Sequence, residues 1–428
     1  MQKLELGYQH SVQSLRDGLK QSDKIVYHSN GNRAFSAKVF LNRVKPVLAK
    51  AGITRIGDIS FLSATHYPVF QSCRPNIFYH TAIGQNTGSQ GKGPHSEQAT
   101  LSCMMEAIEG YCAEPRNSFL VRASYDFLRS HQVVLNPQKY VSSINAEKVQ
   151  LDEPVMWTKA YHVQMDCEIL IPAEVVFYPF LSKLYRTQPH FPSSTNGLAS
   201  GATYLEATTH ALYEVIERYY NHLFDLGKVQ VEAIYEEELI QKGIEETKAA
   251  VRGEYELQLY SLEIPGIKNL PMIMCLLVGD QDTYYGMGCS ARVDVSIDRA
   301  ISEALQSQAT VISGGREDLE TDEISLGQVP LFENTPQPEK RSLRIGHLRK
   351  RVYDRDFRSL RDEFQFLIRW LKNLGYEHTL IANLTRAGLD LPVVKVIIPD
   401  MDSIQTVQRS SQLDSQSLLK YQFPNIVD

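Results

Sequence analysis

PSSTNGLASGATYLEATTHALYEVIERYYNHLF, residues 192–224, reads as a glycine-rich turn that runs into an amphipathic helix. At about 100° per residue, four polar side chains fall within about 80° of one another on this helix: Glu206, His210, Glu214 and Glu217. Leu, Val, Ile and Ala side chains cover much of the opposite arc. One face of the helix is therefore expected to pack against a core, while the other gathers negative charge.

Carboxylates gathered in this way favour a bound cation. Two carboxylates about 4 Å apart repel by roughly 4 kcal/mol at an effective dielectric constant near 20, unless a positive charge lies between them. A single Glu-x-x-Glu pair, taken alone, is better explained by a solvated helix face with Arg218 as its counter-charge. The decision between these interpretations depends on whether the pattern recurs.

The pattern recurs in two other segments. In GKGPHSEQATLSCMMEAIEGYCAEP, residues 91–115, three polar residues share about 60° of one helical face: Ser102, Glu106 and Glu109. Residues 286–318, GMGCSARVDVSIDRAISEALQSQATVISGGRED, place three more on neighbouring turns: Arg299, Glu303 and Gln306. Each helix alone could be an ordinary amphipathic helix. Three of them, each beside a glycine-rich turn, predict a shared polar site.

Taken in order, the three segments resemble the YcaO family. The resemblance lies in GKG followed by SxxxExxE, NGLASG followed by HALxEVIER, and GxGC followed by an EAxQS helix. It extends to GITRIGDIS, YPVFQSCRPN and LPVVKVIIPD, and so covers the chain from about residue 52 to 402. It implies an α/β (α+β) fold with helices packed on mixed or antiparallel sheets around a nucleotide site. It also implies an N-terminal segment, residues 1–65, followed by a catalytic domain, residues 66–428.

The resemblance also implies the roles of particular side chains. Four glutamates would be catalytic and would hold Mg²⁺ ions that bridge to ATP phosphates: Glu106, Glu109, Glu214 and Glu217. Carboxylate and phosphate oxygens are the ligands that Mg²⁺ prefers. Nucleotide contacts are implied for Ser102, Ser193, Asn196, Arg218, Glu303 and Gln306. Asn196 has a competing explanation, because Asn-Gly readily forms a tight turn. Arg33 and Ser36 resemble a basic residue and a hydroxyl near the nucleotide, although Ser36 also suits a helix N-cap.

Members of this family activate a peptide backbone amide. A nucleophile adds to the carbonyl, ATP phosphorylates the resulting oxygen, and phosphate leaves. A Cys, Ser or Thr of the substrate gives an azoline, and external sulfide gives a thioamide. The enzyme need not supply the nucleophile, which fits a sequence without a convincing Ser/His/Asp or Cys/His arrangement. The expected substrate is a ribosomally made precursor peptide or protein, with a homodimer left open.

The two ends of the sequence bear on the chemistry and on partners. Azoline-forming members often end in a proline-rich tail, whereas this sequence ends YQFPNIVD, which favours thioamidation. The first fifty residues leave no room for a full winged-helix peptide-recognition domain. A separate partner for peptide recognition or sulfur delivery is therefore expected.

Composition excludes several other classes of protein. The net charge of −6 gives no long-range attraction for nucleic acid, and the basic run 340–362 contains aspartates typical of a solvated helix. The six cysteines form no zinc-ligand spacing. No signal peptide is evident, and the longest apolar run, 270–278, is too short to cross a bilayer. A cytoplasmic protein with reduced cysteines and no membrane association is expected.

Several further elements are predicted along the chain. Helical pieces should flank a loop at 28–36, and strands are expected within 52–80, 155–163, 169–178, 257–290 and 391–398. Residues 229–248 read as an acidic surface connection, 324–338 as a linker, 343–374 as one long helix and 402–428 as a tail. Lys92 in GKG is not a P-loop lysine, because Asn86 stands where the motif G-x-x-x-x-G-K-[ST] requires its first glycine. A lone GxGxxA at 286–291 lacks the partner residues of a dinucleotide site.

Two other functions compete with the enzyme. A nucleotide-binding scaffold could present a precursor peptide to a partner without turnover, and peptide-dependent release of ADP and phosphate separates the two. A carboxylate-bridged di-metal oxidase would require Glu-x-x-His pairs. His210 instead precedes Glu214 by four residues, and the sequence has too much strand pattern for a helical bundle.

Overall fold

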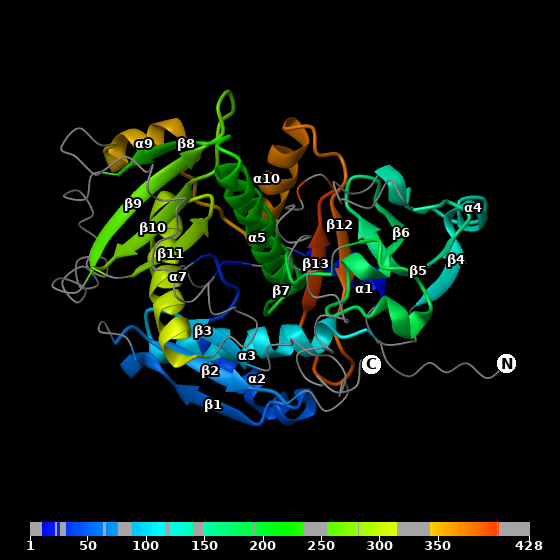
Figure 1. Ribbon diagram of the computed structural model, residues 1–428, viewed down its shortest axis with the longest axis horizontal. Helices are drawn as coiled ribbons and strands as arrows, with labels where there is room; N and C mark the ends of the chain where they lie inside the picture. Colours follow the sequence, from blue (N-terminus) through cyan, green and yellow to red (C-terminus); the bar gives the residue numbers. More distant parts are fainter. Residues whose placement is uncertain are drawn as a thin grey trace, which may run out of the picture.

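Three antiparallel sheets and the long helices packed on them form the computed structural model (Figure 1). The structure describes residues 11–21, 24–25, 31–62, 66–75, 88–115, 120–139, 149–191, 193–234, 255–280, 282–314, 343–399 and 401. All pairs of named strands in these ranges are antiparallel. The predicted α/β (α+β) class is thereby confirmed. The linker at 324–338 and the tail from residue 402 lie outside the described residues.

The first sheet has the order β1-β2-β3 and is covered by one long helix. Its strands are β1 (Arg55–Asp58), β2 (Val69–Cys73) and β3 (Gly88–Lys92), and the helix is α3 (Ser96–Ala113). A short helix, α2 (Ala37–Val44), packs on α3. A Cβ at Gly91 would lie 2.0 Å from the backbone nitrogen of Cys103, so only glycine lets β3 approach α3 this closely. The GKG segment therefore places Lys92 directly beside a helix.

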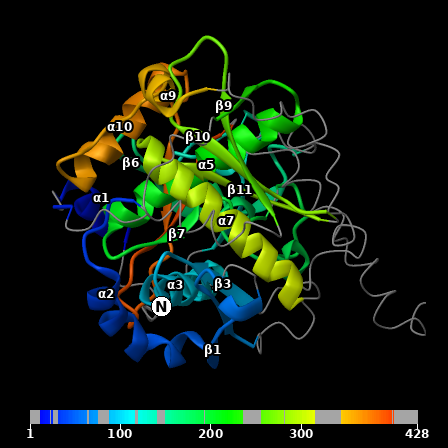
Figure 2. The ribbon, with the colours of Figure 1, turned by 90° about the vertical axis from the view of Figure 1, so that its left-hand side faces the viewer.

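The second sheet has the order β11-β10-β9-β8, and helix α7 lies across it (Figure 2). The elements are β8 (Gln230–Ala233), β9 (Glu256–Glu263), β10 (Met272–Val278), β11 (Thr283–Cys289) and α7 (Val293–Ser313). Alternate residues of β10 enter two different core clusters: Ile273 packs with α7, while Met274 packs on the opposite side with α5. Burial on both faces explains the continuous apolar run in this strand.

The third sheet has the order β4-β5-β12-β13-β7, with β6 also paired to β5. Its strands are β4 (Val121–Ser124), β5 (Pro154–His162), β6 (Cys167–Pro172), β7 (Leu198–Ser200), β12 (Leu380–Asn383) and β13 (Val393–Ile397). Helix α5 (Tyr204–Asp225) packs on β13 and β7, and α1 (Val12–Lys20) packs on α5 and β5. Thr203 caps α5 by accepting a hydrogen bond from the backbone N–H of Glu206, 3.2 Å away. A four-residue helix, α4 (Tyr125–Leu128), follows β4.

The long helix predicted for 343–374 is wrong, because the chain forms two helices, α9 (Ile345–Arg351) and α10 (Leu360–Asn373). The intervening residues bind the start of α7 instead of continuing the helix. An Asp354 carboxylate oxygen accepts from the Val293 N–H at 3.0 Å, and the Arg355 N–H donates to the Ala291 carbonyl at 2.8 Å. These contacts with distant residues replace the helical hydrogen bonds.

Two smaller predictions also change. The strand expected to reach residue 178 ends at Pro172, where a 3₁₀ turn, Ala173–Val175, begins. Ser36 is the residue at the N-cap of α2, but its side chain makes no capping hydrogen bond. None of the helices in the described part of the chain is long and apolar enough to cross a membrane.

Candidate active site

Helix α3 presents two of the predicted carboxylates towards β3 and β7. Glu106 is exposed, and its Oε1 lies 3.4 Å from the backbone nitrogen of Gln90 in β3. Glu109, one turn further on, accepts hydrogen bonds at Oε1 from the backbone N–H of Ser200, 2.7 Å away, and from the Ser200 hydroxyl, 2.6 Å away. Ser102 is half-buried one turn before Glu106. The helix thereby links the first sheet to the strand that leads into α5.

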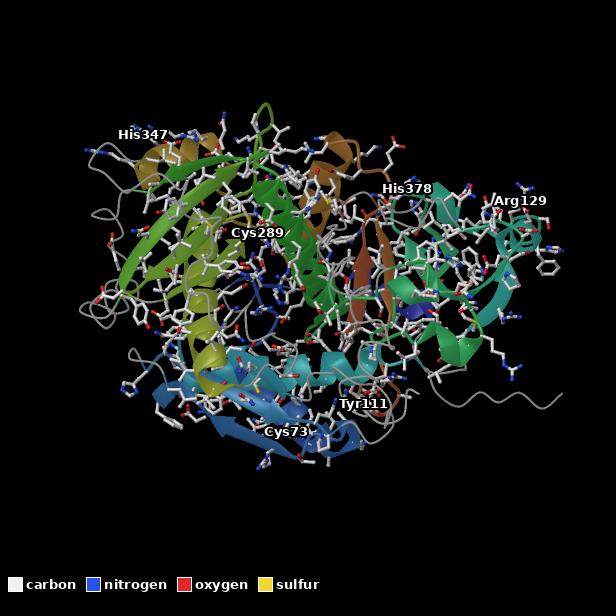
Figure 3. All side chains as sticks on the ribbon, viewed as in Figure 1. Cys73, Tyr111, Arg129, Cys289, His347 and His378 are labelled. Carbon is white, nitrogen blue, oxygen red and sulfur yellow. The ribbon has the colours of Figure 1, made fainter. Side chains whose placement is uncertain are left out.

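Helix α5 contributes Glu214, Glu217 and Arg218 to the same region. Glu217 is buried, and its Oε2 accepts a hydrogen bond of 3.1 Å from the backbone N–H of Cys289 at the end of β11. Figure 3 shows Cys289 beside α5. Although burial opposes it, the charges of Glu303, Glu214 and Glu217 raise the pKa of Arg218. This arginine therefore interacts with carboxylates from both α5 and α7.

Helix α7 supplies Glu303 and a second arginine. Glu303 Oε2 forms an ion pair of 3.1 Å with Nζ of Lys92, the last residue of β3. Arg299 donates to the carbonyl of Cys289 at 3.2 Å and to Nδ1 of His210 at 3.2 Å. Burial, followed by the charges of Arg299, Arg33 and Lys92, holds the pKa of His210 well below its usual value. His210 is therefore a neutral imidazole in a cationic environment.

The carboxylates of the three helices repel one another. Burial, with repulsion from Glu106 and Glu214, raises the pKa of Glu109 to about 8. Burial and the charge of Glu303 raise the pKa of Glu217 to about 7. Burial also raises the pKa of Glu214, despite the nearby charges of Arg218 and Lys395. Side chains from α3, α5 and α7 thus lie within electrostatic reach of one another, as the sequence pattern predicted.

Glu303 differs from the other carboxylates in its charge. Burial would raise its pKa, but the charges of Lys92 and Arg218 outweigh burial, and the pKa of Glu303 is lowered. Glu214 and Glu303 are only half-buried and Arg218 is exposed, yet all three lie deep among protein atoms. Solvent therefore reaches these three side chains.

Two residues predicted to contact the nucleotide, Ser193 and Asn196, lie in the loops around the glycine-rich turn and not on the three helices. The Ser193 hydroxyl donates to the Phe177 carbonyl at 2.8 Å and accepts from the Phe180 N–H at 3.1 Å. Asn196 is buried in a turn closed by a hydrogen bond of 2.8 Å from the Leu198 N–H to the Thr195 carbonyl. Ser193 therefore links two loops, and nucleotide contacts for Ser193 and Asn196 stay predictions. Gln306 is half-buried on α7, on the turn after Glu303, and its contact also stays a prediction.

Lys395 was missed as a site residue, although the strand that contains it was recognised. It is only 3% exposed in β13, and its Nζ donates to the carbonyl of Ser194 at 2.5 Å, beside the glycine-rich turn. Its charge acts on Glu214. A lysine inside the apolar run VVKVI is the signal that could have revealed it, because lysine is almost never fully buried unless it is paired.

The donor set fits Mg²⁺ and a triphosphate. The raised pKa values of Glu109, Glu214 and Glu217 indicate that the protein's own cations do not fully neutralise this region, and an added cation would. Within the described residues no group of three or more His, Cys, Asp or Glu forms a ready metal site. Mg²⁺ is commonly held by one or two carboxylates together with substrate phosphates, which suits pairs of glutamates on separate helices. Lys92, Arg218, Arg299 and Lys395 supply positive charge for phosphate oxygens.

The fold and the site define a mixed α/β protein whose helices bring carboxylates and cations together in one region. Residues 90–402 match the family model described as "YcaO cyclodehydratase, ATP-ad Mg2+-binding". The chain belongs to the YcaO family, whose cofactors are ATP and Mg²⁺.

Several known proteins are similar to this chain. An uncharacterised protein of Methanothermobacter thermautotrophicus is 29% identical over 368 residues, which cover 83% of this chain and 91% of the relative. The structure of YcaO from Methanopyrus kandleri bound with AMPPCP and Mg²⁺ matches with a TM-score of 0.72 and 22% identity. The match covers 91% of this chain and 97% of that chain. A heterocyclase in complex with substrate and cofactor matches with a TM-score of 0.73 and 16% identity. The match covers 90% of this chain and 54% of that chain. The two structural likenesses show the fold.

Proposed function

We propose that this protein uses ATP and Mg²⁺ to activate a backbone amide of a ribosomally synthesised peptide or protein, giving a thioamide or an azoline. The observation that carries the proposal is the convergence of Glu109, Glu214 and Glu217 with Lys92 and Arg218. Family membership supports an ATP-dependent, peptide-modifying activity of the cyclodehydratase type. The catalytic domain is taken to be residues 66–428, with 1–65 as an N-terminal segment that contributes Arg33 beside Glu206.

In this proposal, the four glutamates Glu106, Glu109, Glu214 and Glu217 hold Mg²⁺. Bound Mg²⁺ would supply positive charge that offsets the charge of the phosphate oxygens during phosphoryl transfer. Arg218, Lys92 and Arg299 would donate hydrogen bonds to phosphate oxygens, where negative charge grows during transfer. His210 is neutral, accepts a hydrogen bond from Arg299 at Nδ1, and adds no positive charge of its own. Ser200 fixes the rotamer of Glu109 through two hydrogen bonds.

The nucleophile is proposed to come from outside the protein. Burial raises the pKa of Cys103 to about 12 and raises that of Cys289, the thiol next to Glu217. Neither thiol is therefore available as a thiolate near neutral pH. A substrate Cys, Ser or Thr would give the azoline, whereas a sulfide donor, supplied by a partner protein, would give the thioamide.

The decisive experiment incubates the protein with ATP, Mg²⁺ and a candidate precursor peptide encoded nearby, with and without a sulfide source. ADP and phosphate release should depend on the peptide, and mass spectrometry should show loss of water or exchange of oxygen for sulfur. Glu106→Gln should abolish the product. ATP binding without peptide-dependent turnover, with the partner present, would instead identify a scaffold.

A further inference from the structure

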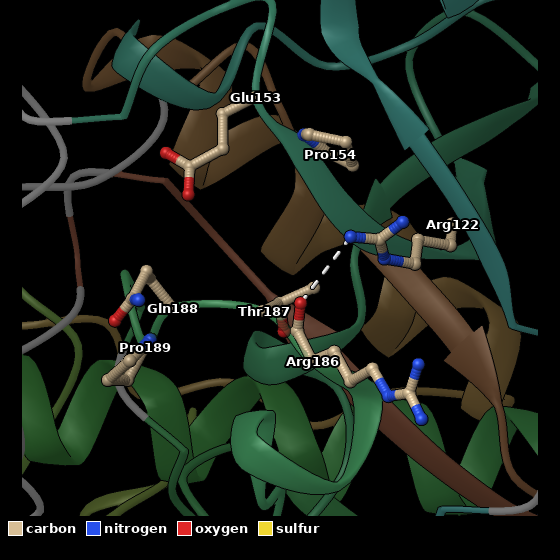
Figure 4. A pocket seen from close by; sticks show the side chains of 7 residues that line it. All are labelled: Arg122, Glu153, Pro154, Arg186, Thr187, Gln188 and Pro189. Atoms are coloured by element: carbon tan, nitrogen blue, oxygen red, sulfur yellow. Dashed lines mark hydrogen bonds between the residues drawn. The ribbon is translucent and has the colours of Figure 1, made fainter.

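A pocket of about 430 Å³ lies outside the carboxylate cluster, between β4, the start of β5 and the loop before the glycine-rich turn. Arg122 and Arg186 line it together with Glu153, Thr187 and Gln188 (Figure 4). Both arginines are exposed. In a chain with a net charge of −6, a pocket with two arginines is a local exception. Nothing in the proposed chemistry of phosphoryl transfer uses it.

Both guanidinium groups keep N–H donors that have no acceptor among the described residues. One guanidinium nitrogen of Arg122 donates to the backbone carbonyl of Arg186 at 3.4 Å, and no other partner of Arg122 is found among the described residues. The guanidinium of Arg186 makes no hydrogen bond or ion pair within the part of the chain that the structure describes. Arginine presents its N–H groups in a fixed fork that matches a carboxylate, so this pair can bind an acidic side chain.

The backbone also holds Arg186 in an unusual conformation. Its φ is 55°, in the left-handed region that costs a residue with a Cβ about 1 kcal/mol. Three bonds keep the loop in place: Arg122 to the Arg186 carbonyl, and the N–H and hydroxyl of Thr187 to the carbonyl of Ser182, at 3.2 and 3.3 Å. A strained residue fixed by its neighbours is a common feature of ligand-binding loops.

Glu153 limits what the pocket can bind. Figure 4 shows its carboxylate across the pocket from Arg122, and its Oε2 lies 3.5 Å from Nε2 of His190. Glu153 therefore does not neutralise the arginines, but it repels a second negative charge. The pocket suits one carboxylate in an otherwise uncharged segment, and it disfavours a polyanion such as nucleic acid.

The pocket is connected to the active site through the chain itself. Only three residues separate Pro189, on the pocket wall, from Ser193, so the two lie at most about 14 Å apart. The carbonyl of the next residue, Ser194, accepts the hydrogen bond from Lys395. An extended peptide anchored in the pocket would cover this distance, towards the turn that Lys395 contacts, within about five residues at about 3.3 Å per residue.

We propose that this pocket is a subsite for the peptide substrate, which binds a single Asp or Glu a few residues from the amide to be modified. That the bound peptide is the substrate of this enzyme rests on the proposed function. The binding itself depends only on Arg122 and Arg186.

Binding is tested on the full chain with short fluorescein-labelled Gly-Ser peptides that carry one Asp, one Asn or a run of Asp residues. The one-Asp peptide should bind best, and its binding should weaken as salt is added. Arg122→Gln with Arg186→Gln should weaken it about three- to tenfold, the range for two exposed charge pairs. Arg129→Gln is the matched control, because Arg129 is exposed on the neighbouring helix end and pairs with Asp126 at 3.1 Å.

Equal binding of the Asp and Asn peptides up to millimolar concentration, or an unchanged affinity in the double arginine variant, overturns the subsite. Preference for the run of Asp residues overturns its single-carboxylate specificity. ATP affinity of the double variant, measured separately, should equal that of wild type. Arginine-dependent peptide binding without any peptide-dependent ATP turnover would refute the proposed function alone. Turnover that ignores the acidic residue would refute the subsite alone.

Discussion

Glu217→Gln should stabilise the protein at alkaline pH while it abolishes activity. The amide of glutamine keeps an oxygen that can accept the hydrogen bond from Cys289, so the change removes the charge alone. The pKa of Glu217 is about 7 in the folded protein, compared with an ordinary value of 4.5. Because the folded-state pKa is the higher one, deprotonation opposes folding: stability falls as pH rises above 4.5, and the loss is complete above about 7.

The magnitude follows from the size of this difference. At about 1.4 kcal/mol per pKa unit, the wild-type protein loses up to about 3 kcal/mol that the glutamine variant retains. Urea unfolding without nucleotide, in EDTA, should show similar stability for the two proteins near about pH 4 and a more stable variant near about pH 8. Peptide-dependent ADP release should be lost. Matching pH profiles would show that the carboxylate is solvated, and retained turnover would remove Glu217 from the site.

Three further substitutions test other parts of the structure. Glu106→Gln, at an exposed position, should change the free energy of unfolding by less than about 0.5 kcal/mol but lower peptide-dependent ADP release at least about a hundredfold. A large loss of stability together with the loss of ADP release would indicate misfolding. Lys92→Met removes the ion-pair partner of Glu303 and should weaken nucleotide binding about tenfold in a fluorescence titration, with the pKa of Glu303 rising; unchanged affinity would contradict a phosphate contact. Gly91→Ala should destabilise by at least about 2 kcal/mol in urea unfolding, whereas the control Gly57→Ala, with nothing within 4 Å of its Cβ, should not.

The sequence allowed the three site helices to be predicted because their signals are local. Charged and apolar residues repeat with helical spacing, and each glycine-rich lead-in ends where a helix begins. α3, α5 and α7 therefore lie within the segments chosen. The convergence of their polar faces was inferred from recurrence and from the family resemblance, since spacing within one helix says nothing about distance to another.

Elements fixed by distant contacts were not predictable in the same way. The break between α9 and α10 depends on Asp354 and Arg355, which bind the start of α7 some sixty residues earlier in the chain. Lys395 interrupts an apolar strand, and its hydrogen-bond partner, the carbonyl of Ser194, comes from a distant part of the chain. In both cases the local pattern is overridden by polar groups that find partners only in the folded chain.

The raised pKa values argue that this region is built for a ligand and not for stability. A solvated helix face, the simplest explanation of each glutamate pair, would leave the carboxylates near their ordinary pKa values. Instead, burial and repulsion from neighbouring carboxylates raise the pKa values of Glu109 and Glu217 to about 8 and about 7, and for Glu217 this holds despite the charges of Arg218 and Lys92. A core optimised for folding would replace such groups by apolar ones. Their stability cost is explained if the cation that relieves it arrives with ATP, so that binding, and not folding, neutralises the cluster.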